Sequence, residues 1–141
     1  MDIKLRLTLR EGSVYYFTDR ALTSPLPHYF IVVNSDPLSQ RVLVLTVVTS
    51  QVADAKLRRA ACPETLVEIS PADFDVFTKP SIVDGNWLKS IPLAEFNARF
   101  VGNEIKSFGK DLPSAIRKAL RKAIHASKLV AAEMKALVGP A

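Results

Sequence analysis

The chain contains little of what metal and cofactor chemistry usually require. Its 141 residues include one cysteine and two histidines, and the histidines, His28 and His125, are far apart in the sequence. The sequence has no paired Cys/His or His-Glu spacing that would hold a metal ion. It also has neither a Gly-rich phosphate loop nor a nucleophile-elbow motif. We therefore expect no metal and no other cofactor.

The single cysteine, Cys62, excludes an internal disulfide and is typical of a protein in a reducing cytoplasm. No apolar run approaches the roughly 20 residues of a membrane span. The first residues, MDIKLRLTLREGS, alternate charged and apolar side chains, unlike a secretory signal. These absences predict a cytoplasmic protein that does not enter a membrane.

The net charge of +5 is unevenly distributed along the chain. Residues 113–141 contain six basic residues against one acidic residue, whereas the preceding part contains thirteen of each. The basic character therefore belongs to the C-terminal segment, and it does not by itself predict that the main domain binds nucleic acid.

The strongest structural signal lies between residues 28 and 51. Residues 30–33 and 42–48 are short apolar runs rich in β-branched side chains, and the polar turn formers of residues 34–40 separate them. This pattern predicts two buried strands joined as a hairpin. Because both faces of these strands are apolar, we expect them at the centre of a closed sheet or small barrel.

The flanking sequence predicts further short strands and one long helix. Expected strands cover residues 3–9, 13–18, 66–69 and two stretches within 74–91, separated by a loop at 19–27 and short helical pieces at 53–61 and 92–100. An apolar stripe predicts a helix over residues 111–139, with Asp111 as N-cap and Gly139 as the stop. The prediction is a mainly β domain over residues 1–110, with a basic amphipathic helix over 111–141 belonging to the same domain.

Polar residues gather where the predicted strands end. In an antiparallel hairpin the start of one strand lies beside the end of the other, so His28 should share one rim with Thr49 and Ser50. The other polar residues expected on this rim are Arg20, Lys79, Ser81, Asp84 and Asn86. Metal-free RNA cleavage needs a group that removes the 2′-OH proton, a group that protonates the leaving oxygen, and donors for the phosphorane. Histidine, with an ordinary pKa of about 6.5, can transfer protons at neutral pH. The alternative is that these are polar strand ends without a chemical role.

At these residues the chain resembles the PemK/MazF family of toxin endoribonucleases. The similarity extends roughly from Gly12 to Phe96 and has four parts in the family's order. These are residues 12–16 (GSVYY), 28–34 (HYFIVVN), 45–50 (LTVVTS) and 81–91 (SIVDGNWLKSI), and a C-terminal helix closes both patterns. The resemblance implies an SH3-like barrel, usually a homodimer, that cleaves single-stranded RNA such as mRNA without a metal and is neutralised by a cognate antitoxin.

The resemblance also implies roles for individual residues. His28 would be the acid/base, and Thr49, Ser50 and Arg20 would stabilise the phosphorane. Substrate contacts would come from the remaining polar positions, which are Lys79, Ser81, Asn86, Arg117 and Arg121.

Two positions depart from the family pattern, and they leave other functions open. His28 replaces the family's usual Arg before Pro, and Asn86 replaces its Asp before Gln. A second interpretation is therefore a non-catalytic barrel that binds RNA or a protein partner. A third is an interaction domain that uses the apolar stripe of the terminal helix, where Leu120 and Ile124 lie.

Overall fold

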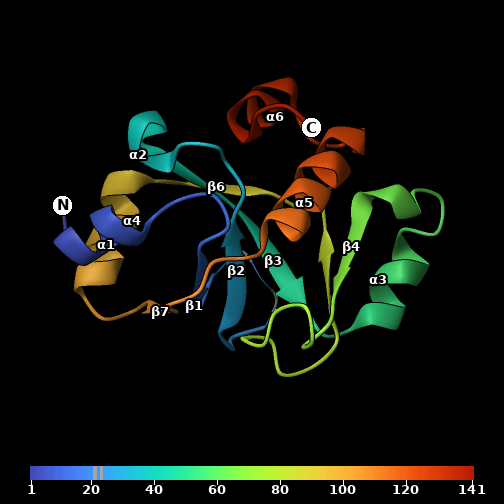
Figure 1. Cartoon of the computed structure of the whole chain (residues 1–141), viewed down its shortest axis with the longest axis horizontal. Helices are drawn as coiled ribbons and strands as arrows, with labels where there is room; N and C mark the ends of the chain where they lie inside the picture. The colour runs from blue at the N-terminus through green and yellow to red at the C-terminus, as the bar shows by residue number, and fades with distance from the viewer. Residues whose placement is uncertain (21, 23) are drawn as a thin grey trace.

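A computed structural model describes residues 1–20, 22 and 24–141 (Figure 1). Residues 21 and 23, within the predicted loop 19–27, lie outside the described residues. The strands are β1 (Val14–Phe17), β2 (His28–Val32), β3 (Val42–Thr49), β4 (Leu66–Ile69), β5 (Ser81–Asp84), β6 (Lys89–Pro92) and β7 (Lys106–Ser107). The helices are α1 (Ile3–Thr8), α2 (Pro37–Gln40), α3 (Val52–Arg58), the 3-10 turn η1 (Pro63–Thr65), α4 (Leu93–Val101), α5 (Ser114–Ala126) and α6 (Ala132–Val138).

The predicted hairpin is confirmed and forms the centre of the sheet. β2 and β3 are antiparallel, with Phe30 opposite Val47. Successive side chains of β2 alternate between two separate apolar cores, so that Phe30 enters one core and Ile31 the other. Phe30 and Ile31 are each completely buried in their own core. The apolar character of both strand faces is therefore explained by a sheet that is covered on both sides.

The sheet is open, and the prediction of a closed SH3-like barrel is wrong. Its seven antiparallel strands run in the order β4-β5-β3-β2-β1-β7, and β6 pairs with β3. Among the described residues no pairing joins the edge strands β4 and β7. A turn at residues 85–86 separates the two strands predicted within 74–91, but β5 and β6 pair with β3 rather than with each other. Helices, not closure of the sheet, shield its two faces, and the architecture is mixed α/β.

Different helices cover the two faces of the sheet. Leu5 of α1 and Phe96 of α4 enter one core, and these helices lie together at the left of Figure 1. Leu120 and Ile124 of α5 enter the other core, with Val138 of α6. Because Leu120 and Ile124 are 2% and 0% exposed, the apolar stripe packs on its own sheet. This contradicts the interpretation in which the stripe binds a partner. Among the described residues no helix is long and apolar enough to cross a bilayer.

The N-terminal segment is helical, and the predicted strand over residues 3–9 is wrong. The Asp2 carboxylate accepts the backbone N–H of Leu5 at 3.0 Å and caps α1. Of the alternating apolar residues, only Leu5 and Leu9 are buried, at a spacing of one helical turn, while Ile3 and Leu7 are exposed. The cap and the Leu5/Leu9 pair outweigh the period-2 pattern.

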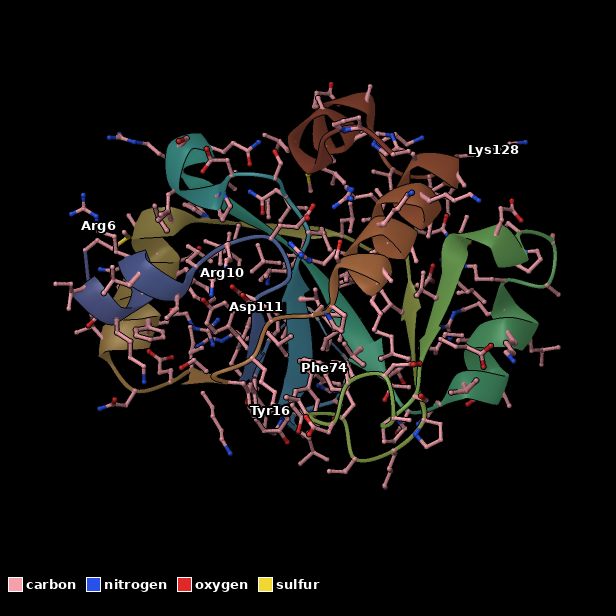
Figure 2. All side chains as sticks on the ribbon, viewed as in Figure 1. Arg6, Arg10, Tyr16, Phe74, Asp111 and Lys128 are labelled. Carbon is pink, nitrogen blue, oxygen red and sulfur yellow. The ribbon has the colours of Figure 1, made fainter. Side chains whose placement is uncertain are left out.

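The predicted C-terminal helix is broken in two between α5 and α6. At the break Ser127 is extended and 1% exposed, and its hydroxyl accepts the backbone N–H groups of Leu129 and Val130 at 3.1 and 3.2 Å. The predicted cap is also wrong, because Asp111 instead pairs with Arg10 (Figure 2) and Pro113 precedes α5. The predicted stop is confirmed, since α6 ends at Val138 and Gly139 has a φ of +86°.

Candidate functional site

A cavity of about 350 Å³ lies at the open end of the central hairpin, where β2 begins and β3 ends. Leu22, Val47 and Trp87 form its apolar wall. The hairpin contributes His28 and Thr49. The other polar lining residues are Gln51, Asp54, Arg58, Arg59 and Asp84. Basic, acidic and hydroxyl groups thus surround a single imidazole.

The hairpin register places His28 beside Thr49. Phe30 pairs with Val47, and continuing the same register by two residues brings His28 opposite Thr49. The hydroxyl oxygen of Thr49 accepts the backbone N–H of Gln51 at 3.1 Å, which leaves the hydroxyl hydrogen available to a ligand. His28 is half-buried, and its Nδ1 is shielded from solvent without a hydrogen-bond partner among the described residues.

Two arginines reach the cavity from the end of α3. Only Ser50 and Gln51 separate Thr49 from this helix, so α3 must fold back beside the strand end. Arg59 donates through Nε to Asp84 at 2.9 Å, and the two side chains are 23% and 11% exposed. Arg58 is exposed and forms no ion pair with a described residue. One cation is therefore fixed by a buried carboxylate, while the other can meet an anion.

Asp84 is held in turn by the loop that follows it. Its Oδ1 accepts the backbone N–H of Asn86 at 2.9 Å and the side-chain amide of Asn86 at 2.8 Å. The same amide nitrogen donates to Thr65, and the amide oxygen accepts the hydroxyl of Ser127 at 2.5 Å. All polar groups of the Asn86 side chain are thus used inside the protein, and this residue supports the ion pair at the cavity.

Trp87 supplies an aromatic surface in the cavity that His28 also lines. Its ring centroid lies 6.4 Å from that of Phe30, and its carbonyl accepts the hydroxyl of Thr46 at 3.1 Å. The indole is half-buried, so it contacts the core and also lines the cavity. Aromatic rings in such positions can stack on an unpaired base.

A second hollow adjoins the cavity and contains two more of the predicted residues. Ser50 and Lys79 line it together, and Gln51 and Asp54 line both hollows. Ser81 is 6% exposed, and its hydroxyl donates to the carbonyl of Lys79 at 2.9 Å. Ser81 thereby fixes the segment that carries Lys79.

Five predicted residues line neither hollow. Ser81 and Asn86 hydrogen-bond to Lys79 and Asp84, which do line them, and the other three are arginines. Arg20 is an exposed turn residue that lines neither of them. Arg117 and Arg121 belong to α5 on the other face of the sheet, where their guanidinium groups lie 3.9 and 2.6 Å from the carboxylate of Glu11. The structure thus brings His28 and Thr49 together, puts Ser50 and Lys79 next to them, and separates the α5 arginines from this group.

Sequence reasoning missed Arg58 and Arg59 as site residues. Their signal was two adjacent arginines at the end of a short helix that immediately follows the central strand. Because such a helix must turn back at the strand end, its last residues could have been placed near Thr49. Among the described residues, no three His, Cys, Asp or Glu side chains are grouped so as to hold a metal ion.

The fold is similar to that of a solved endoribonuclease. That structure is described as an endoribonuclease in complex with its cognate antitoxin from Mycobacterial species. The match has a TM-score of 0.53 and 14% sequence identity, and it covers 82% of this chain and 90% of the other. No protein-family model and no curated protein sequence matches the chain. The likeness is thus one of fold, and membership of the PemK/MazF family stays a prediction.

Proposed function

We propose that this chain is a toxin-like endoribonuclease of a type II toxin-antitoxin system that cleaves single-stranded RNA without a metal. The observation that carries the proposal is the cavity in which the imidazole of His28 lies with the hydroxyl of Thr49 and the guanidinium of Arg58. The fold likeness to an endoribonuclease supports it. As the resemblance implies, the protein would form a homodimer and bind a cognate antitoxin.

In the proposed reaction His28 accepts the proton of the substrate's 2′-OH. The 2′-oxygen attacks the adjacent phosphorus, the bond to the 5′-oxygen breaks, and the protonated imidazole returns its proton to the leaving oxygen. The products are a 2′,3′-cyclic phosphate and a 5′-OH. Every atom and proton is supplied by the RNA and one imidazole.

The donors of the cavity would stabilise the charge that develops on the phosphorane. The free hydroxyl hydrogen of Thr49 and the unpaired guanidinium of Arg58 are suited to this, since fixed donors aimed at developing charge stabilise a transition state. Ser50, Lys79 and Arg20 would contact neighbouring phosphates, and Trp87 would stack on a base beside the scissile bond.

One observation favours a non-catalytic alternative in which the same cavity binds RNA or a protein partner without cleaving it. A general base is usually oriented by a third group, yet Nδ1 of His28 has no hydrogen-bond partner among the described residues. The position that would carry the family's Asp is Asn86, whose amide is fully engaged elsewhere. An imidazole that no other group orients can bind a phosphate without cleaving the RNA.

Cleavage of a long unstructured RNA in the presence of EDTA tests the proposal. The wild type should produce 2′,3′-cyclic phosphate ends, identified by mass spectrometry, and His28→Ala should cut at least about 100-fold more slowly. His125→Gln is the matched control, since His125 lies on α5, away from the cavity, and should keep the wild-type rate. RNA binding without cleavage by the wild type would support the alternative, and equal cleavage by His28→Ala would refute the role of His28.

A further inference from the structure

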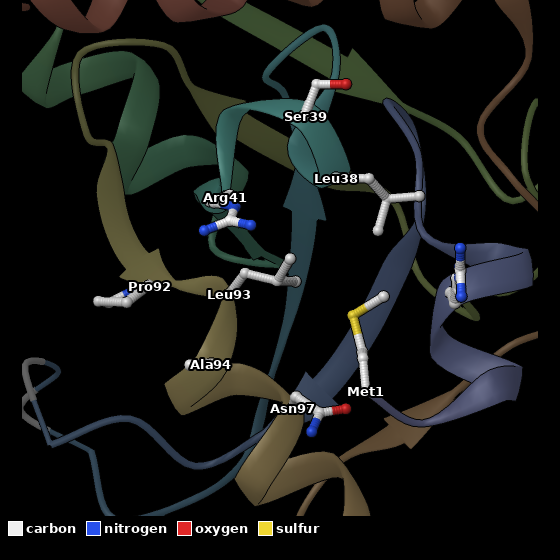
Figure 3. A pocket seen from close by; sticks show the side chains of 9 residues that line it. Met1, Leu38, Ser39, Arg41, Pro92, Leu93, Ala94 and Asn97 are labelled. Atoms are coloured by element: carbon white, nitrogen blue, oxygen red, sulfur yellow. The ribbon is translucent and has the colours of Figure 1, made fainter.

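Another hollow lies at the opposite end of β3 from His28, where Val42 pairs with Pro92. It is an open groove of about 690 Å³ between α1, α2 and the start of α4 (Figure 3). Leu38, Pro92 and Leu93 contribute apolar surface to it, and Arg6 and Arg41 contribute charge. None of the residues assigned to RNA cleavage lines this groove.

The charge of the groove has one sign. Arg6 and Arg41 are exposed, and neither forms an ion pair with a described residue. No Asp or Glu is among the residues that line the groove. By contrast, the exposed Lys56 and Lys110 both pair with carboxylates. Two unpaired guanidinium groups in one hollow are suited to carboxylates, which they bind in a bidentate manner.

An exposed apolar strip continues from the groove along α1. Ile3 and Leu7 are 73% and 72% exposed, and with Arg6 they have the i, i+3, i+4 spacing of one helix face. Leu5 and Leu9 point the other way, into the core. Large apolar side chains exposed beside a groove are typical of a surface that another molecule covers.

We propose that this groove and the α1 face bind an acidic peptide segment of another protein, one that presents aliphatic side chains between its carboxylates. The carboxylates would pair with Arg6 and Arg41, and the aliphatic groups would cover Leu93, Ile3 and Leu7. The residues that line the groove favour a peptide over RNA, because none of them is aromatic and single-stranded nucleic acid is usually held by stacking on aromatic rings.

The proposal does not depend on the proposed ribonuclease function, because the two hollows share no residue. If that function is correct, a cognate antitoxin is one source of such a segment. Binding at the groove and cleavage at the cavity can succeed or fail separately, so one experiment on each distinguishes them.

Selection from two displayed dodecapeptide libraries tests whether the groove binds acidic peptides. The selection is made at about 150 mM salt, where long-range electrostatic attraction is largely screened. One library is built from Asp, Glu, Leu, Ile and Ala, and the other replaces the acidic residues with Gln. We expect enrichment from the acidic library only. Arg41→Glu and Arg6→Glu should each lower the affinity for the best peptide by about 10-fold or more, the effect of losing one charge-assisted hydrogen-bonded pair.

Lys128→Glu is the matched control, because it makes the same charge change on an exposed residue at the other side of the molecule (Figure 2). It should change peptide affinity by less than about twofold, as expected for a distant surface charge. The two arginines lie on different elements, so misfolding of one variant leaves the other informative.

Three results would overturn the proposal. The first is equal enrichment from both libraries, or peptides whose affinity falls equally in Lys128→Glu and in both arginine variants. The second is an unstructured RNA that binds the wild type and is released by Arg6→Glu and Arg41→Glu, which would make the groove a nucleic-acid site. The third is a dimer, seen by analytical ultracentrifugation, that Leu7→Glu dissociates, which would mean that a second copy covers this face.

Discussion

The two hollows at the ends of β3 rest on the same apolar core but differ in how their charges are arranged. Leu22 and Trp87 of the cavity pack against this core, as do Leu38 and Leu93 of the groove. The eight-residue strand between them spans roughly 25 Å at about 3.3 Å per residue. The cavity contains an imidazole and two carboxylates beside its arginines, whereas the groove contains arginines alone.

This difference suits the cavity to proton transfer and the groove to binding alone. A site with an imidazole can accept and return a proton near neutral pH, and a carboxylate that fixes one arginine leaves the other free for substrate. A site that has only permanent cations can hold an anion but cannot transfer a proton. The comparison therefore supports the proposals of RNA cleavage at the cavity and of partner binding at the groove.

The largest effect on stability is expected for Asp84→Ala at the cavity. The change leaves the largely buried guanidinium of Arg59 without its carboxylate and removes both hydrogen bonds from Asn86. Loss of one partner from a buried ion pair costs about 3 to 4 kcal/mol. Urea unfolding should show a fall of this size in the free energy of unfolding. A change below about 1 kcal/mol would mean that the paired charges of the cavity contribute no more to stability than the unpaired arginines of the groove.

The free energy of unfolding should depend on pH through Tyr15, a residue of the core that the two hollows share. Burial raises the pKa of Tyr15 to about 12 from its ordinary value of 10. The neutral phenol is favoured in the folded state, so its contribution to stability is complete below pH 10 and is lost as the pH rises towards 12. Two pKa units correspond to about 2 to 3 kcal/mol.

Tyr15→Phe removes this titration and tests it directly. The Tyr15 hydroxyl is buried without a hydrogen-bond partner of ordinary geometry among the described residues, so the change should be neutral or slightly stabilising at pH 7. Urea unfolding at pH 9, 10 and 11 should show the wild type losing stability faster than Tyr15→Phe. Parallel curves for the two proteins would contradict the assignment.

At the cavity, Arg58→Ala should lower kcat/KM for RNA cleavage by about 10-fold or more, or about 1.4 kcal/mol, since it removes a charged donor to the phosphorane. Lys56→Ala is the control on the same helix. Lys56 is paired with Glu68 on the surface, away from the cavity, and should leave kcat/KM unchanged. Equal losses in both variants would indicate general attraction of RNA to positive charge.

The smallest effect is expected for Arg6→Ala at the groove. Arg6 is exposed and forms no ion pair with a described residue. Surface substitutions of this kind change the free energy of unfolding by less than about 0.5 kcal/mol. A larger loss in urea unfolding would show that Arg6 has a structural partner, and it would remove the contrast with Asp84→Ala.

The sequence predicted the parts of the molecule that depend on local pattern and pairing geometry. Apolar runs of β-branched residues predicted β2 and β3, and the antiparallel pairing of a hairpin predicted that His28 would lie beside Thr49. The helix stop at Gly139 also followed from local chemistry.

The remaining features depend on contacts between distant residues. Strands that are apolar on both faces are compatible with a closed barrel and with helices on both sides, and the pattern cannot distinguish them. Ser127 continued the helical periodicity of the last segment, but its hydroxyl bonds to Asn86 and ends α5. The Arg59–Asp84 pair likewise joins a helix to a strand that is remote in sequence.

The assignment of proton transfer to the cavity is tested most directly by single-turnover kinetics of His28→Ala at saturating RNA in EDTA, with the RNA Kd measured in parallel. We predict that the cleavage rate falls at least about 100-fold while Kd changes by less than about threefold, because the proposed phosphate contacts of Arg58, Lys79 and Arg20 remain. An unchanged rate, or a loss that appears only in Kd, would contradict the account and leave the cavity as a binding site.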